Sequence, residues 1–260
     1  ACMNEPLPEY MVVGEGHSTL VFLHGLGGDH TNWQPQFAEF ASDYRCVAWT
    51  LPGYGLSPPL EALTWPNLSD MLARVLDDIS VDRATIVGIS MGGYIAQQFA
   101  ADYDERVDRL ILAATSSQFG RGSASFSEKF LAARLKPLDD GRTPADLAPD
   151  VVRGLLSSDA PLDALTNCVA SMSRISTDAY RAALHCLVTW SFTDYLYKIS
   201  APTLCLAGAD DATAPVAALR ALAEGLPDGQ LEVIDNCNHL MNLDRPNEFN
   251  ELTRQFLNSH

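Results

Sequence analysis

Short apolar segments alternate with longer amphipathic segments along most of the 260-residue chain. The apolar segments predict strands at residues 10–13, 20–23, 46–49, 84–87, 109–113, 203–207 and 231–234. The amphipathic segments predict helices near residues 32–42, 66–79, 91–102, 214–224 and 247–257. Strands that alternate with helices are typical of a mostly parallel sheet that is covered on both faces. The hydrophobic pattern therefore predicts an α/β fold.

The alternation stops between residues 117 and 198. This stretch has a helical composition without a strand pattern, and it is interrupted by Pro137, Pro144, Pro149 and Pro161. We expect residues 117–198 to form a helical insertion. The core is then made of residues 1–116 and 199–260. A helical insertion beside a site can close a pocket and exclude water from it.

Ser90 stands between glycines where a predicted buried strand meets a predicted helix. The segment is Gly88-Ile89-Ser90-Met91-Gly92. So sharp a turn tolerates only small neighbours, and it leaves the serine hydroxyl exposed at the N-terminus of the helix. About one chain in ten of this length contains the bare G-x-S-x-G pattern by chance, so the flanking elements carry the prediction. We predict that Ser90 is a nucleophile.

A nucleophilic serine needs a base, and the base needs an acid that orients it. The last two predicted strands are followed by Gly208-Ala209-Asp210-Asp211 and by Asp235-Asn236-Cys237-Asn238-His239. Because sites in parallel sheets form at the carboxyl ends of the strands, we predict His239 as the base and Asp210 or Asp211 as the acid. Cys237 is an alternative nucleophile, but it lacks the strand-turn-helix setting.

A glycine-rich loop, His24-Gly25-Leu26-Gly27-Gly28, follows the strand predicted at residues 20–23. Its glycines let the backbone pass close to a substrate oxygen. We therefore predict that the N–H groups of Leu26 and Met91 form an oxyanion hole. A phosphate-binding loop is the alternative, but neither a G-x-x-x-x-G-K nor a G-x-G-x-x-G spacing is present.

These motifs, in this order, resemble those of the α/β-hydrolases, and the resemblance runs nearly end to end. Within the superfamily the chain most resembles the 3-oxoadipate enol-lactonase group and related esterases and lactonases. The resemblance lies in residues 88–93, 105–112, 190–194, 202–208 and 239–246. It implies the α/β-hydrolase fold, with residues 117–198 as a helical cap (lid) inserted after the sixth strand. Its glycine-to-acid spacing selects Asp211 over Asp210. Three features depart from the family pattern. Relatives usually carry Asp in place of Thr50 and a small residue in place of Asn238, and the His239 loop also carries Cys237.

The cap is expected to line the substrate pocket. Trp190 matches a tryptophan that recurs near the end of the cap in the enol-lactonase group, and Phe119 and Phe126 are further candidates for substrate binding. The alternative is that these rings only pack the cap helices together. An anionic substrate would need a cation, and among the basic residues of the cap we consider Arg121, Arg134, Lys136, Arg174 and Arg181.

Composition narrows the class of partner and cofactor. A formal net charge of −16 argues against nucleic acid, because Lys and Arg bind the phosphate backbone. The sequence contains no run of about 18 apolar residues, which a membrane-spanning helix would need. The six cysteines form neither a disulfide framework nor a metal-ligand pattern, so we expect reduced thiols in a cytoplasmic protein without metal or cofactor. A monomer and a homodimer are both compatible with the sequence.

These features predict a serine hydrolase that cleaves a small carboxylic ester or lactone through an acyl-enzyme on Ser90. The enol-lactonase resemblance makes a lactone that bears a carboxylate the most specific expectation. One alternative is a C–C bond hydrolase acting on aromatic ring-cleavage products. Leu240 counts against it, because those relatives often carry an aromatic residue after the histidine. The other alternative is a non-catalytic ligand-binding protein of the same fold.

Overall fold

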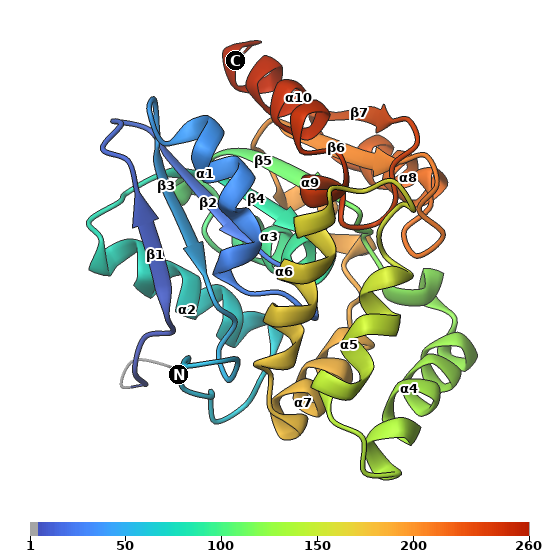
Figure 1. The fold of residues 1–260 in the computed structure, drawn as a ribbon. Coiled ribbons are helices and arrows are strands. Elements are labelled where there is room, and N and C mark those ends of the chain that lie inside the picture. The colour runs from blue at the N-terminus through green and yellow to red at the C-terminus, as the bar shows by residue number, and fades with distance from the viewer. Residues whose placement is uncertain (1–4, 260) are drawn as a thin grey trace.

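The computed structural model describes residues 5–259 and contains a seven-stranded sheet with helices on both faces (Figure 1). The strands are β1 (Tyr10–Val13), β2 (Thr19–Leu23), β3 (Arg45–Trp49), β4 (Ala84–Ile89), β5 (Val107–Ala113), β6 (Thr203–Gly208) and β7 (Gly229–Ile234). Their spatial order is β1-β3-β2-β4-β5-β6-β7. Only β1 is antiparallel to its neighbour in this sheet, so the carboxyl ends of β2 to β7 meet at one edge. The predicted α/β fold is confirmed.

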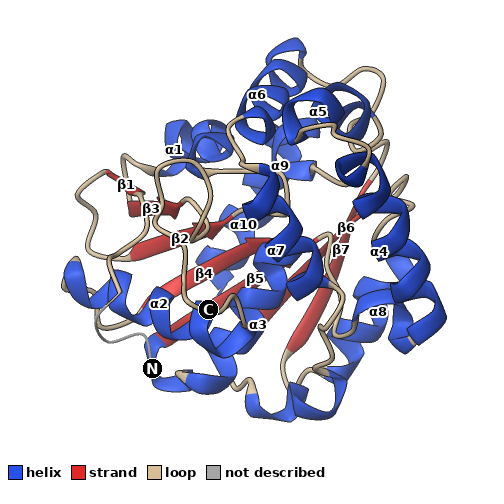
Figure 2. Cartoon of the chain, turned by 90° about the horizontal axis from the view of Figure 1, so that it is seen from below, coloured by secondary structure: helices blue, strands red, loops and turns tan. Residues whose placement is uncertain are grey.

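Helices of the core cover both faces of the sheet (Figure 2). On one face α1 (Gln34–Phe40) packs against α10 (Pro246–Ser259), and the other face carries α2 (Trp65–Asp78), α3 (Met91–Asp102) and α8 (Val216–Gly225). The helix predicted at residues 32–42 begins as the 3₁₀ turn η1 (His30–Trp33) before α1. Pro35 lies in the first turn of α1 and has no backbone N–H to donate, so the α-helical hydrogen bonds cannot continue back through this residue.

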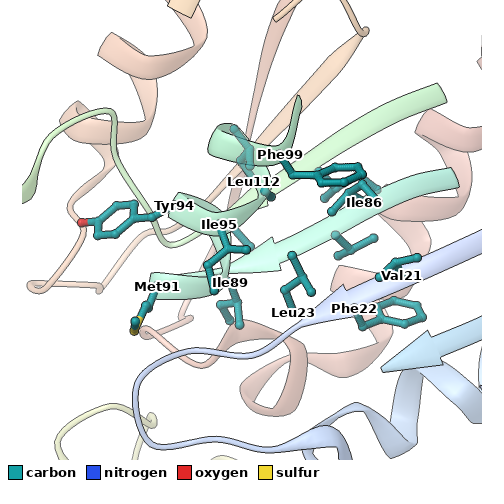
Figure 3. Close-up of a cluster of buried hydrophobic side chains, with 14 of the residues drawn as sticks. Val21, Phe22, Leu23, Ile86, Ile89, Met91, Tyr94, Ile95, Phe99 and Leu112 are labelled. Carbon is teal, nitrogen blue, oxygen red and sulfur yellow. The ribbon is translucent and has the colours of Figure 1, made fainter. Parts of the chain in front are cut away.

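The helix that follows Ser90 is held by its apolar face. In Figure 3, Ile95 and Phe99 of α3 lie against Ile86 and Ile89 of β4, and all four side chains are buried. Each buried side chain of this size contributes about 1.5–3 kcal/mol. This packing fixes the start of α3 relative to the ends of β2 and β4.

Residues 117–198 are helical, as the pattern predicted, and their helices gather beside the sheet (Figure 1). They form η3 (Phe119–Gly122), α4 (Ala124–Asp139), α5 (Pro144–Arg153), α6 (Leu162–Ser173), α7 (Thr177–Leu187) and η4 (Thr193–Lys198). The expected position after the sixth strand is wrong. Among residues 5–259 the cap follows β5, because five strands precede it along the chain.

Candidate active site

Ser90 occupies a strained turn between β4 and α3. Its φ of 55° and ψ of −119° lie outside the regions that L-residues usually adopt, at a cost of about 1–3 kcal/mol. Two neighbouring glycines make the turn sterically feasible. A Cβ on Gly92 would lie 2.0 Å from the carbonyl oxygen of Leu23, and a Cβ on Gly88 would lie 2.3 Å from the carbonyl oxygen of Gly92. The turn leaves Ser90 only partly buried, although α3 around it is packed.

The structure brings Ser90, His239 and Asp211 together from three different loops. The Nε2 atom of His239 lies 2.9 Å from the Ser90 Oγ, and its Nδ1 atom lies 2.8 Å from the Asp211 Oδ2. Both the imidazole and the carboxylate are buried, with 4% and 3% of each residue exposed. This arrangement can move a proton from the hydroxyl to the ring, because the carboxylate orients the ring and stabilises its positive charge.

The Asp211 carboxylate is fixed in place by its own turn. Its Oδ1 accepts hydrogen bonds from the backbone N–H groups of Thr213 (2.8 Å) and Ala214 (2.9 Å), which leaves Oδ2 for the imidazole. Asp210 is exposed, and its backbone N–H donates to the carbonyl of Cys237. The geometry thus places Asp211, and not Asp210, on the histidine.

The glycine-rich loop passes directly beside Ser90. A Cβ on Gly25 would lie 3.1 Å from the Ser90 Cβ and 3.6 Å from its Oγ. Met91 provides the first N–H of α3, which has no acceptor within the helix. The Leu26 carbonyl points away to the Tyr54 hydroxyl, which donates to it at 2.5 Å. The Leu26 and Met91 amides therefore belong to two backbone segments that flank the serine.

His24 holds this loop as a neutral side chain. Burial lowers the pKa of His24. Its Nε2 accepts from the Leu51 N–H (2.9 Å), so its Nδ1 carries the proton and donates to the Gly25 carbonyl (2.7 Å). This histidine is a support for the glycine-rich loop, and the sequence motif alone did not indicate that role.

The three aromatic residues predicted to bind substrate lie in different surroundings. Trp190 is buried, stacks on Tyr94 and Phe192, and donates from its Nε1 to a backbone carbonyl at 3.1 Å. Phe119 is half-buried against other cap rings, whereas Phe126 is 51% exposed. Through these contacts, Trp190 packs the cap onto α3. A role of the three in substrate binding stays a prediction.

The buried thiols lie in surroundings that disfavour the thiolate. Burial raises the pKa of Cys46, Cys168, Cys186 and Cys205 to about 12. Burial, and then the nearby Asp244 carboxylate, raise the pKa of the Cys237 thiol as well. Because the thiolate is the reactive form, Cys237 is a poor alternative nucleophile.

We expect a thiol reagent to leave the activity intact. At pH 8 a thiol with a pKa near 12 is only about 10⁻⁴ ionised. In a Cys2→Ser background, which removes the cysteine outside the described residues, 5,5′-dithiobis(2-nitrobenzoate) should modify none of the five buried cysteines of the native protein. After unfolding, all five should react. Loss of ester hydrolysis in step with modification of the native protein would instead indicate a functional thiol.

Within residues 5–259, no group of three or more His, Cys, Asp or Glu side chains is placed to hold a metal ion. No helix in that range is long and apolar enough to span a membrane.

Comparison with known proteins shows the family. The chain belongs to the α/β-hydrolase fold family, whose model matches residues 18–246. It is 29% identical to a poly(3-hydroxyalkanoate) depolymerase of Ectopseudomonas oleovorans, over 98% of this chain and 89% of the relative. It is 28% identical to 3-oxoadipate enol-lactonase 1 of Acinetobacter baylyi, over 94% and 90% of the two chains. The predicted resemblance to α/β-hydrolases and enol-lactonases is confirmed.

A solved structure agrees with the family assignment. A thermophilic esterase from Thermogutta terrifontis superposes with a TM-score of 0.85 at 25% identity. The superposition covers 96% of this chain and 92% of the esterase. The protein is therefore an α/β-hydrolase, and its relatives include an esterase and an enol-lactonase.

Proposed function

We propose that this protein is a serine hydrolase of small, uncharged carboxylic esters and lactones, with Ser90, His239 and Asp211 as its catalytic residues. The observation that carries the proposal is the continuous series of contacts from the Ser90 Oγ through both nitrogens of His239 to the Asp211 carboxylate. Ester and lactone chemistry is supported by the similarity of the chain to an enol-lactonase and to an esterase.

In the first half of the reaction, the Nε2 of His239 removes the Ser90 proton as the Oγ attacks the substrate carbonyl carbon. The carbonyl electron pair moves onto oxygen, where the Leu26 and Met91 N–H groups stabilise the anion, each by about 3 kcal/mol. The carbonyl then re-forms, and the bond to the leaving oxygen breaks. That oxygen takes the proton from the imidazolium Nε2, so the alcohol leaves and an acyl-enzyme remains.

In the second half, a water molecule replaces the alcohol. The Nε2 of His239 removes a proton from the water, and the hydroxide attacks the acyl carbon. The second tetrahedral anion collapses, and the Ser90 Oγ recovers its proton from the imidazolium. In a lactone the leaving alcohol stays attached to the acyl group, and the same steps open the ring.

Three of the five basic candidates in the cap are already paired with carboxylates. Arg174 is paired with the buried Asp29, Arg181 with Asp139 (2.6 Å), and Lys136 with Asp140 (2.8 Å). Burial acts to raise the pKa of Asp29, but hydrogen bonds from Thr31 and Arg174 outweigh it and lower that pKa. Asp29 thus stays charged and neutralises Arg174.

The other two basic candidates in the cap differ from these ion pairs. The Arg134 guanidinium lies over the Phe130 ring, 5.3 Å from its centroid, and Arg121 is exposed. The protein as a whole carries a net charge of −16, which disfavours an approaching anion. We therefore propose a neutral ester or lactone in place of the carboxylated lactone that the resemblance favoured.

A substrate panel tests this proposal. We expect p-nitrophenyl butyrate and a neutral lactone to exceed a carboxylated enol-lactone and a p-nitrophenyl palmitate by at least about tenfold in kcat/KM. Tenfold corresponds to about 1.4 kcal/mol. The reasons are the negative field and a cap that suits a compact ligand. Raising the ionic strength should narrow the gap between neutral and anionic lactones, because salt screens the repulsion.

Other outcomes of the panel would change the assignment. Preference for a ring-cleavage dienoate would indicate the C–C bond hydrolase. Preference for the carboxylated lactone at every salt concentration would contradict the uncharged-substrate proposal. Absence of both turnover and labelling of Ser90 by a fluorophosphonate probe would indicate a non-catalytic binding protein.

A further inference from the structure

The turn between α5 and α6 in the cap is bonded to the loop that carries His239. The N–H of Leu240 donates to the Leu155 carbonyl at 3.1 Å. The side-chain amide of Asn238 donates to the Leu156 carbonyl at 3.4 Å. The residues on both sides of the histidine in sequence therefore contact the cap directly.

The same two segments also share a small apolar cluster. The short helix α9 (Met241–Asp244) follows the histidine and contributes one side chain to a cluster otherwise made by the cap. The cluster consists of Val152, Leu156, Ala164, Cys168 and Leu243, with Leu240 packed beside it. Each member is buried, so separating the cap turn from the histidine loop would expose apolar surface.

Asp244 lies at the centre of this contact and is 1% exposed. Its Oδ2 accepts from the backbone N–H of Asn238 (2.6 Å) and from the Ser157 hydroxyl (2.7 Å). Its Oδ1 accepts from the Ser157 N–H at 3.1 Å, and the Arg245 guanidinium lies 3.4 Å away. A buried carboxylate is costly unless it is hydrogen-bonded, and here three donors and a cation surround it.

Asn238 transmits this anchoring to the histidine. Its backbone N–H is bound by Asp244, and its side-chain Oδ1 accepts from the His239 N–H at 2.8 Å. The backbone on the N-terminal side of His239 is thus held through Asn238. An unsupported imidazole would lose its alignment with both Ser90 and Asp211, and a misplacement of about 1 Å can cost about a hundredfold in rate.

We propose that Asp244 is a positioning residue, which joins the cap turn to the Asn238–His239 backbone and so holds the imidazole between Ser90 and Asp211. This inference rests on the proposed function. On the cap side, Asp244 is bound by Ser157. The Asn238 side chain adds a second link, since its amide donates to the Leu156 carbonyl of the cap and its Oδ1 accepts from the His239 N–H.

The test is Asp244→Asn, measured with p-nitrophenyl butyrate. An amide has one acceptor oxygen, so its NH₂ group must face one of the donors that the carboxylate now binds. We expect kcat to fall about 10–100-fold while KM changes less than about threefold, because no substrate contact is altered. The downfield proton NMR signal of the His239–Asp211 hydrogen bond should broaden or disappear, which reports on the imidazole independently of turnover.

Asp159→Asn is the matched control. It removes the other carboxylate partner of Arg245, a 2.7 Å contact in which the Asp159 side chain is 74% exposed. We expect this variant to keep wild-type kcat and KM within about twofold, because an exposed ion pair contributes little. Ser157→Ala should lower kcat at least about threefold. Combined with Asp244→Asn, it should add little, because both changes break the same contact.

A folded Asp244→Asn protein with wild-type kcat and an unchanged NMR signal would overturn the proposal. If Asp244→Asn does not fold, the Ser157→Ala variant tests the proposal instead. A wild-type kcat in Ser157→Ala would then overturn the proposal. If the wild-type protein hydrolyses no ester, the proposed function fails. The NMR signal then still tests the positioning by itself.

Discussion

Replacing Ser90 by alanine is expected to lower kcat/KM for p-nitrophenyl butyrate by more than about a thousandfold, while the protein stays folded. The hydroxyl lies 2.9 Å from the His239 Nε2 and forms the covalent bond in the proposed mechanism. Removing a nucleophile of this kind costs far more than removing a packing contact, because the remaining residues have no group to acylate. The measurement is steady-state hydrolysis, together with labelling by a fluorophosphonate probe.

Ser80→Ala is a matched control for the backbone of this variant. Ser80 has a φ of 54°, nearly the value of Ser90, but it follows α2 and bonds back to Asp77. Both substitutions place alanine at a positive φ, so each is expected to change the unfolding temperature only modestly. Only the Ser90 variant should lose activity and labelling. If Ser90→Ala retained a tenth of the activity, another nucleophile would be required.

Asp211→Asn is expected to lower kcat by about four orders of magnitude. An asparagine can still accept hydrogen bonds from Thr213 and Ala214, so the turn survives. Its NH₂ group then faces the His239 Nδ1, which favours the wrong tautomer for a base and no longer stabilises the imidazolium. The measurement is kcat with the same ester, and circular dichroism should show an unchanged fold.

Asp210→Asn is the neighbouring control and should change kcat by less than about twofold. Its side chain is exposed, and only its backbone N–H is engaged, with the carbonyl of Cys237. A larger loss in Asp210→Asn than in Asp211→Asn would exchange the roles of the two carboxylates. Equal, small losses would indicate that neither orients the base.

Local sequence determined the setting of Ser90. The buried strand, the glycines and the helix are each encoded within a few residues, since the turn requires small side chains at Gly88 and Gly92 wherever the rest of the chain lies. The alternation of apolar and amphipathic segments likewise predicted the α/β fold and the helical cap. The spatial order of the strands in the sheet came only from the structure.

The site beyond Ser90 was predictable to different degrees. Resemblance selected Asp211 over Asp210, whereas the residues alone left both open, because adjacent side chains in a turn point in directions that its backbone decides. Periodicity placed Trp190 in the cap. It could not show that the ring stacks on Tyr94 of α3, since an aromatic residue that packs and one that lines a pocket give the same pattern.

By itself, the sequence determined the elements and the chemical types at their ends, because strand, turn and helix preferences act over a few neighbouring residues. Tertiary structure alone decided which distant groups meet. The Asp244 carboxylate and Ser157 are 87 positions apart, and their contact depends on the cap turn docking beside the histidine loop. Buried apolar surface sets that docking and is non-directional, so the pairing of polar groups follows from the packed shape and leaves no local signal in the chain.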